Sequence, residues 1–283
     1  MAKLMADSGR GLAKLRAIVI SGNGVNCEME MAHANRLAGV DDVRIASIYD
    51  LLSGDVRLDD YQLLNMPGGF QDGDDLGSSK AAANRYQHAH AQGADEPIQD
   101  QLRRFIDDGK CIIGVCNGFQ LLIKLGLLPA IDGKYFQQQA TLTFNDRGRF
   151  EDRWVRLVVD EQSPCVFTKG MHQLELPVRH GEGKIVPADD QVLSAVKERH
   201  LAPIRYADAE GNPTQDYPAN PNGSIDAIAA LCDESGRVFG VMPHPEAFVH
   251  RTNHPRWTRE ELPEEGAGLA IFRNAVKYLK DNF

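Results

Sequence analysis

The feature that most constrains the fold is a sharp turn predicted at residues 114–118, Gly-Val-Cys-Asn-Gly. The apolar run at 111–115 predicts a buried strand, and the apolar residues at helical spacing over 119–126 predict a helix. Two glycines allow a strained turn between them, so Cys116 would project from a nucleophile elbow. A thiol at a helix N-terminus is stabilised as thiolate. The alternative is a small buried core residue, which free cysteines often are.

The order of apolar runs before this turn is typical of an α/β fold. Strands separated by helices imply a parallel sheet with right-handed crossovers. We therefore expect a mostly parallel central sheet flanked by helices, in one domain over residues 16–283 after a short N-terminal extension, 1–15. The expected strands are 16–20, 43–49, 62–66, 111–115, 154–159, 225–231 and 238–242. The first expected helix ends near residue 37. The others span 78–92, 98–108, 119–126 and 268–279.

Composition limits the partners and the location. A net charge of −9, with no block of lysines or arginines, argues against a nucleic-acid surface. No apolar run approaches the ~20 residues of a membrane span, and no basic-then-apolar leader precedes the first strand. We therefore expect a cytoplasmic protein that binds no membrane.

The cysteines and glycines predict neither a metal site nor a cofactor in this chain. The five cysteines are odd in number, scattered and without a CxxC pair, so no zinc site or disulfide framework is expected. No GxxxxGK[ST] or complete GxGxxG pattern follows a strand. Any ATP-driven step would therefore require another chain.

A nucleophilic cysteine needs a base, and the base needs a group that orients it. Among nine histidines, His244 follows an apolar strand in the motif Met-Pro-His-Pro-Glu. The flanking prolines hold the chain extended, and side chains two apart in an extended chain share a face. Glu246 can therefore orient His244. A surface turn is the alternative. His180, between Arg179 and Gly181, is a further candidate for a ligand contact.

Acyl transfer also requires donors for the oxyanion. The N–H of Asn117, directly after the nucleophile, is one candidate. The second is an exposed amide of the Pro67-Gly68-Gly69 turn, which ends a neighbouring strand. A purely structural turn is the alternative there. These residues predict acyl transfer through a thioester, but they do not identify the acyl donor.

At this point the motifs resemble those of the class I (triad-type) glutamine amidotransferases, which have a flavodoxin-like architecture. More closely, they are similar to the glutaminase part of phosphoribosylformylglycinamidine synthase in purine synthesis. The resemblance covers nearly everything from about residue 16 onward. The matching segments are Val-Asn-Cys-Glu at 25–28, Met-Pro-Gly-Gly-Phe at 66–70 with Gly-Asp at 73–74, residues 114–120, 147–151, His-Gly-Glu-Gly at 180–183, 217–224 and Pro-His-Pro-Glu at 243–246.

The resemblance implies hydrolysis of glutamine to glutamate and ammonia. The implied partner is an ATP-dependent synthetase subunit that converts formylglycinamide ribonucleotide to formylglycinamidine ribonucleotide, and that would carry the ATP and magnesium. Whether a small auxiliary subunit also takes part stays open. Matched residue by residue, the implied roles are nucleophile for Cys116, base for His244, orienter for Glu246, oxyanion donors for Gly68 and Asn117, and substrate binding for Gln120, Gly69, His180 and Gly181.

Two departures from the family pattern lie outside the triad, the first beside it and the second at the rim of the glutamine pocket and the partner contacts. Ala247 stands where the family usually has arginine, and residues 76–80 have no cysteine or arginine at the common places. Two alternatives also stay open. One is an amidotransferase of another pathway or a free-standing cysteine hydrolase of the same fold, and the other is a non-catalytic scaffold.

The segment 207–224 is rich in Gly, Pro and Asn. This composition predicts a long irregular surface loop that adds little to the core. We expect it to serve partner docking or gating, and expect the fold to tolerate replacement of 215–222 by a short Gly-Ser linker. A surface insertion without function is the alternative.

Overall fold

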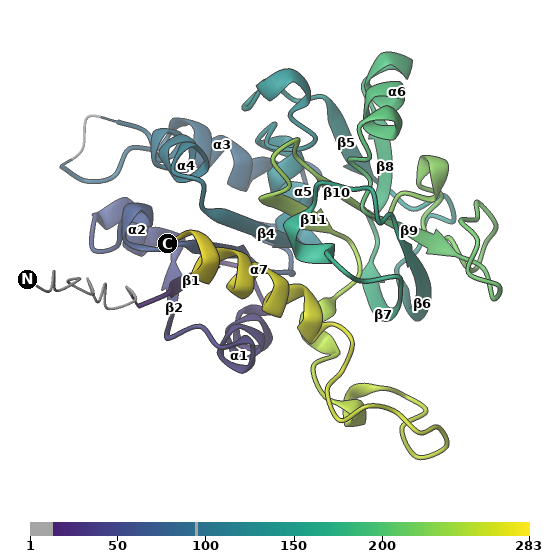
Figure 1. Ribbon diagram of the computed structural model, residues 1–283. Helices are drawn as coiled ribbons and strands as arrows, with labels where there is room; N and C mark the ends of the chain where they lie inside the picture. Colours follow the sequence, from purple (N-terminus) through teal and green to yellow (C-terminus); the bar gives the residue numbers. More distant parts are fainter. Residues whose placement is uncertain (1–13, 94–95) are drawn as a thin grey trace, which may run out of the picture.

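The computed structural model describes residues 14–93 and 96–283, so nearly all of the predicted N-terminal extension lies outside the described residues. A six-stranded sheet has the order β10-β11-β4-β3-β1-β2 (Figure 1). All neighbouring strands pair in parallel except β10, which is antiparallel to β11. The strands are β1 (Arg16–Ser21), β2 (Asp42–Ser47), β3 (Leu63–Met66), β4 (Cys111–Val115), β10 (Ala230–Cys232) and β11 (Val238–Val241).

Helices lie on both sides of this sheet (Figure 1). The first and last helices, α1 and α7, pack against each other, and α3 packs against both α4 and α5 on the opposite side. Strands β3, β4 and β11 are buried throughout, as expected for parallel strands covered on both faces. The helices are α1 (Glu28–Ala38), α2 (Ile48–Ser53), α3 (Lys80–His88), α4 (Ile98–Asp107), α5 (Asn117–Lys124), α6 (Asp190–Glu198) and α7 (Leu269–Asn282).

Two small antiparallel sheets lie beside the main sheet (Figure 1). One has the order β7-β6-β9 and the other pairs β5 with β8. The N–H of His244, just past β11, donates to the carbonyl of Pro177 in β7 at 2.8 Å. This bond ties the three-stranded sheet to the end of the main sheet. The strands are β5 (Ala140–Thr143), β6 (Glu151–Val159), β7 (Gln173–His180), β8 (Lys184–Pro187) and β9 (Ile204–Ala207).

The fold prediction is confirmed, with local errors. The elbow strand was placed at its observed bounds, whereas the expected second strand ends early because Ser47 caps α2 with its side chain and backbone. The predicted strand at 225–231 is mostly wrong, because residues 225–227 form a 3-10 turn and only 230–231 belong to the short strand β10. Helices α2 and α6 and strands β5, β7, β8 and β9 were not predicted individually.

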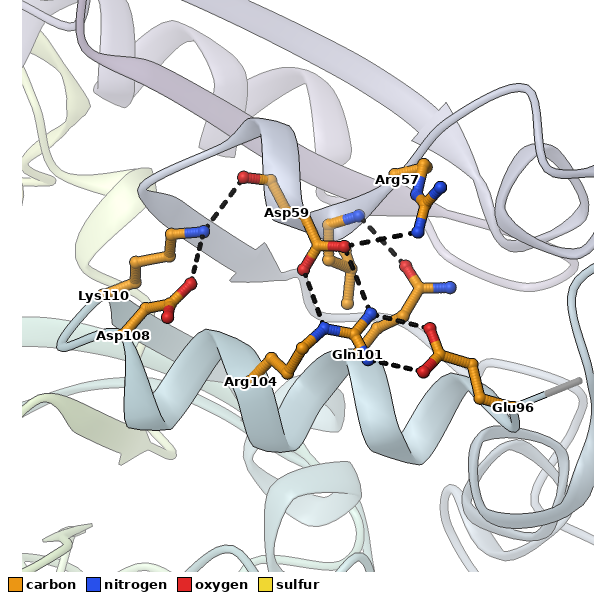
Figure 2. Close-up of polar contacts among 8 residues, drawn as sticks. Arg57, Asp59, Glu96, Gln101, Arg104, Asp108 and Lys110 are labelled. Atoms are coloured by element: carbon orange, nitrogen blue, oxygen red, sulfur yellow. Dashed lines mark hydrogen bonds and ion pairs between the residues drawn. The ribbon is translucent and has the colours of Figure 1, made fainter. Parts of the chain in front are cut away.

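A network of charged side chains fixes α4 to the turn that precedes β3 (Figure 2). The Arg104 guanidinium donates to both oxygens of Asp59, at 3.3 and 3.1 Å, and to both oxygens of Glu96, at 2.6 and 2.7 Å. Nearby, Lys110 Nζ donates to the carbonyl of Asp59 at 3.0 Å. These partly exposed pairs orient the helix, while its buried apolar face, including Leu102 and Phe105, contributes the packing.

Candidate active site

Cys116 lies at the tip of a strained turn between β4 and α5, as the sequence predicted. Its φ and ψ are 51° and −104°, an unusual conformation for a residue with a side chain. The turn is held because the N–H of Cys116 donates to the carbonyl of Val241 in β11 at 2.8 Å. Gly114 and Gly118 face each other across the elbow, where a Cβ on Gly114 would lie 2.6 Å from the carbonyl oxygen of Gly118. The glycines therefore permit the turn.

His244 and Glu246 reach the same place from the end of β11. His244 Nδ1 lies 2.6 Å from Glu246 Oε1, and both side chains are almost fully buried. The short distance means that Nδ1–H donates to the carboxylate, which leaves Nε2 free to act on a substrate. The predicted reason for this pairing was partly wrong. His244 is extended, but Glu246 lies in a 3-10 turn (Pro245–Ala247), so the turn and not strand alternation brings the two together.

The carboxylate and the thiol decide the charge of His244. Burial by itself lowers the pKa of His244, but Glu246 and then Cys116 outweigh it and hold the pKa well above its ordinary value. The favoured state is thus an imidazolium between a carboxylate and a sulfur that can carry negative charge. A cysteine and a histidine poised in this way can form a thioester intermediate, because the sulfur can attack an acyl carbon while the imidazolium protonates the leaving group.

The two amides predicted to hold an oxyanion come from the ends of adjacent strands. Gly68 follows β3, and its missing side chain is a steric necessity: a Cβ there would lie 2.8 Å from His244 Cε1 and 3.6 Å from Cys116 Cβ. Asn117 opens α5, so its N–H has no carbonyl one turn earlier in the helix to bind. Its side chain is braced, since Oδ1 accepts from the N–H of Gln71 at 3.0 Å.

A cavity of about 480 Å³ opens onto Cys116 and His244. This volume suits a small molecule such as an amino acid. All four residues predicted to bind substrate line it: Gly69, Gln120, His180 and Gly181. Residues that were not among the predicted site residues line it as well: Asn26, Cys27, Phe70, Asp74, Asp75, Ser78, Phe144, Phe150, Arg179 and Glu182. Six of these lie in the matched motifs, which was a signal that could have found them: Asn26, Cys27, Phe70, Asp74, Phe150 and Glu182.

The predicted substrate residue Gln120 is already fully engaged within the protein. Its Nε2 donates to the carbonyl of Glu182 at 2.6 Å, and its Oε1 accepts from Asn117 Nδ2 at 2.9 Å. The Glu182 carboxylate in turn accepts from the N–H of Ser78 at 3.3 Å. Gln120 therefore joins α5, the helix that follows Cys116, to the 181–183 segment on the other side of the cavity.

His180 lines the cavity, and its ring is not suited to act as a base beside His244. Burial, with the neighbouring His244 as a smaller cause, lowers the pKa of His180 to about 3. The ring is therefore neutral at physiological pH. Its Nδ1 lies 3.1 Å from Asn145 Oδ1, and Asn145 Nδ2 donates to the His180 carbonyl at 2.9 Å. Asn145 thus fixes the ring and leaves the adjacent Gly181 backbone at the cavity.

Besides Asp75 and Glu182, the cavity wall includes a cationic side chain, Arg179, and a half-buried acidic one, Asp74, that were not predicted to lie there. Arg179 Nη2 lies 3.3 Å from His244 Nδ1. A guanidinium is thus present beside the histidine although Ala247 replaces the arginine expected nearby. Asp74 has a buried Oδ1 without a hydrogen-bond partner among the described residues. Burial, opposed by a contact with Ser78, raises the pKa of the Asp74 carboxyl.

The second half of the 207–224 segment supports the site, so its description as a surface loop was wrong there. Asn220, Asn222 and Ser224 are buried. Asn222 Nδ2 donates to the Tyr206 hydroxyl at 2.9 Å, and Ser224 Oγ donates to the Gly183 carbonyl at 3.2 Å. In this part of the interior, hydrogen bonds of asparagine and serine side chains take the place of apolar packing. Composition alone could not reveal this arrangement. The Gly-Ser replacement of 215–222 would remove this support and is no longer expected to be harmless.

We expect Asn222→Ala to destabilise the protein by about 1–3 kcal/mol, because it leaves the buried Tyr206 hydroxyl unpaired. It should also raise KM for the substrate, since Ser224 and the 181–183 backbone lose a shared brace. Thermal unfolding and steady-state kinetics measure the two effects. The control is Asn212→Ala, whose exposed side chain makes a 3.5 Å contact with Asp208. Equal melting temperatures for the two variants would contradict the bracing role.

Comparison with known proteins identifies the class. Residues 14–279 match the CobB/CobQ-like glutamine amidotransferase domain. A phosphoribosylformylglycinamidine synthase subunit PurQ from Dehalococcoides mccartyi is 42% identical over 273 residues, covering 95% of this chain and 99% of the relative. A PurQ from Methanococcus maripaludis is 38% identical over 274 residues, covering 93% and 97%. The structure of PurLQS from Thermotoga maritima matches with a TM-score of 0.67 and 30% identity over 94% of this chain and 100% of that one.

The fold and the domain match define this chain as a glutamine amidotransferase of the CobB/CobQ-like class. A second solved glutamine amidotransferase from Thermotoga maritima, 13% identical with a TM-score of 0.52, shares the fold. Within the class, the chain belongs to the family of PurQ subunits of phosphoribosylformylglycinamidine synthase. No helix in residues 14–93 or 96–283 is long and apolar enough to cross a membrane.

Proposed function

We propose that this chain is the glutaminase subunit of a phosphoribosylformylglycinamidine synthase, with Cys116, His244 and Glu246 as its catalytic triad. The observation that carries the proposal is the meeting of a strained cysteine elbow and a carboxylate-bound histidine at one cavity, in a chain of the PurQ family. A scaffold without activity would not need a strained nucleophile or a buried imidazolium–carboxylate pair.

The geometry supports a two-step reaction. The Cys116 thiolate attacks the carboxamide carbon of glutamine, and the resulting oxyanion is held by the N–H groups of Gly68 and Asn117. His244 Nε2 gives its proton to the leaving nitrogen, which departs as ammonia and leaves a thioester on Cys116. A water molecule then gives a proton to His244 and attacks the thioester. Glutamate leaves, and Cys116 and His244 return to their starting state.

The walls of the cavity suit the amino-acid end of glutamine. The backbone of His180 and Gly181 and the amide region of Gly69 line the cavity near the nucleophile. The carboxylates of Asp74 and Glu182 line it as well and match a positive α-ammonium group. Binding both ends of the amino acid would hold its carboxamide at the sulfur, which contributes by orientation.

The ammonia would pass to an ATP-dependent synthetase subunit, which would bind ATP and magnesium, and this chain itself would need no cofactor. Three exposed phenylalanines that line the cavity favour such a partner. Phe70, Phe144 and Phe150 are 45%, 66% and 51% exposed. Covering them would bury apolar surface and close the site to water. The chain would act in the cytoplasm. A small auxiliary subunit would be compatible with its similarity to the PurLQS structure.

Aromatic and arginine side chains continue this surface toward the exposed part of the 207–224 segment. Arg147, Arg149 and Arg153 surround the Tyr217 ring, with guanidinium carbons 4.3 to 5.8 Å from its centroid. Tyrosine and arginine are enriched at the centres of protein interfaces. We therefore assign partner docking to Tyr217 and this arginine group, and core support to residues 220–224.

The test measures ammonia release from glutamine, first by the isolated chain and then by the chain together with the synthetase subunit that co-purifies with it. We expect low activity alone and at least tenfold stimulation by the partner, because the open cavity is completed when the partner covers it. A diazo-ketone glutamine analogue should modify Cys116 and no other cysteine. Loss of activity with labelling of Cys27, Cys111, Cys165 or Cys232 would contradict the assignment of the nucleophile.

The alternatives separate in the same experiment. A free-standing hydrolase would show equal kcat/KM for glutamine with and without the partner. A scaffold would release no ammonia in either state. An amidotransferase of another pathway would be stimulated, but its complex would not convert formylglycinamide ribonucleotide to the formylglycinamidine ribonucleotide.

A further inference from the structure

Ser79 departs in two ways from the usual behaviour of a serine next to a helix. It holds the N-cap position of α3, where a serine side chain normally accepts a hydrogen bond from the helix, but it makes no such bond. Its φ is +59°, in the left-handed region that is unfavourable for a residue with a Cβ. The side chain is also fully buried. A buried residue that breaks local rules in this way points to a function elsewhere in the molecule.

The Ser79 hydroxyl binds the helix that follows Cys116. Its Oγ lies 2.9 Å from the carbonyl oxygen of Asn117, and a carbonyl can only accept, so the hydroxyl is the donor. The same segment holds Asn117 a second time, because the N–H of Gln71 donates to Asn117 Oδ1 at 3.0 Å. Asn117 Nδ2 in turn donates to Gln120 Oε1 at 2.9 Å. Both the main chain and the side chain of Asn117 are thus fixed, and all four residues are buried.

These bonds restrict the peptide that carries the proposed oxyanion donor. The N–H of Asn117 belongs to the planar peptide bond between Cys116 and Asn117. The Cys116 end of this peptide is anchored through the bond from the Cys116 N–H to the Val241 carbonyl. Ser79 and Gln71 anchor the Asn117 end. An oxyanion donor stabilises the transition state only when it is aimed in advance at the oxygen, so this anchoring bears directly on the rate.

We propose that Ser79 is a positioning residue for the oxyanion donor Asn117. Its strained backbone directs the hydroxyl away from α3 and onto the first turn of α5. Ser79 is not among the described residues that line the cavity, so it acts through Asn117 and not on the substrate. The kinetic consequence of this inference rests on the proposed function, whereas the link between Ser79 and α5 does not.

The most informative variant is Ser79→Gly, which removes the hydroxyl and relieves the positive φ at once. Ser79→Ala removes the same hydroxyl but keeps the strain, so it should melt at a lower temperature than Ser79→Gly. Both variants should lower kcat for partner-stimulated ammonia release by about tenfold or more. KM for glutamine should change by less than about twofold, because the oxyanion exists only after binding.

The matched control is Ser163→Ala. Ser163 is also buried, and its Oγ accepts from the N–H of Cys165 at 3.3 Å, but it does not line the cavity. This variant should lose stability and keep both kinetic constants. A parental kcat in Ser79→Gly would overturn the proposal. A fall in kcat/KM that comes only from a higher KM would do the same, because it would assign Ser79 to substrate binding.

Hydrogen–deuterium exchange tests the link between Ser79 and α5 without any catalysis. The amides of residues 117–121 should exchange faster in Ser79→Gly than in the parent, and at the parental rate in Ser163→Ala. Unchanged exchange in Ser79→Gly would contradict the positioning role. If exchange responds as expected but the parent complex releases no ammonia from glutamine, the proposed function fails while the link between Ser79 and Asn117 is supported.

Discussion

His244→Ala should reduce glutaminase turnover by about four to six orders of magnitude, nearly as much as Cys116→Ala. The reason is that, in the proposed reaction, His244 supplies the proton to the leaving ammonia and later takes one from water. Its Nε2 is buried in the cavity wall, and Nδ1 is fixed by Glu246 at 2.6 Å. The measurement is partner-stimulated ammonia release under single-turnover and steady-state conditions. The double variant should be no worse than either single variant, because the residues act as a unit.

The matched control is His254→Ala. His254 is also buried, and its Nε2 lies 3.5 Å from a carboxylate oxygen of Glu175, but it does not line the proposed active-site cavity. That variant should lose stability without losing turnover per folded molecule. If His244→Ala keeps most of its activity, the base is another histidine and the proposed triad is wrong.

Glu246→Gln should have a smaller effect on turnover and a distinctive effect on its pH dependence. Glu246 is the largest of the groups that raise the pKa of His244. Removing its charge lowers that pKa, so the imidazolium loses its proton at lower pH. The alkaline limb of kcat/KM should therefore move to lower pH in the variant. The new Gln side chain at position 246 should still orient the imidazole ring in part. An unchanged alkaline limb would show that Glu246 does not set the charge of His244.

Local sequence predicted the parts of the site that depend on chain neighbours. The glycines around Cys116 allow a strained turn, and the turn fixes Cys116 at the end of a buried strand. The ends of β3, β4 and β11 then meet because the strands are parallel and adjacent. This rule brings Gly68, Cys116 and His244 together once the strand order is known, and that order was not predicted from the sequence.

Residues whose role depends on distant contacts could not be predicted. A nearby carboxylate does not by itself identify a base, since His172, His200 and His250 also have one, from Glu161, Asp160 and Glu264. The cavity and the thiol distinguish His244 from these. The buried asparagines at 220 and 222 show the converse error. Their polar composition indicated a loop, while their hydrogen bonds to Ser224 and Tyr206 make them part of the interior.

Gly118→Ala should be among the most destabilising single substitutions in this chain. Gly118 lies in the first turn of α5, where a Cβ would fall on the Met66 carbonyl, 2.6 Å from its carbon, and 2.9 Å from Met66 Cβ. The obstacle is the backbone just before Gly68, so no side-chain rotation relieves it. Either α5 or the end of β3 must move, and both carry proposed oxyanion donors.

We expect a loss of at least ~3 kcal/mol, which at ~2–4 °C per kcal/mol lowers the melting temperature by at least ~6 °C. Gly109→Ala is the matched control. Its φ of +78° strains an alanine, but nothing lies within 4 Å of a Cβ there, so the cost should stay near ~1 kcal/mol. Thermal unfolding of the two variants separates backbone strain from steric overlap. Equal melting temperatures would show that α5 can move away from β3. The close approach of this helix and strand would then not be what holds Cys116 and the two amides in place.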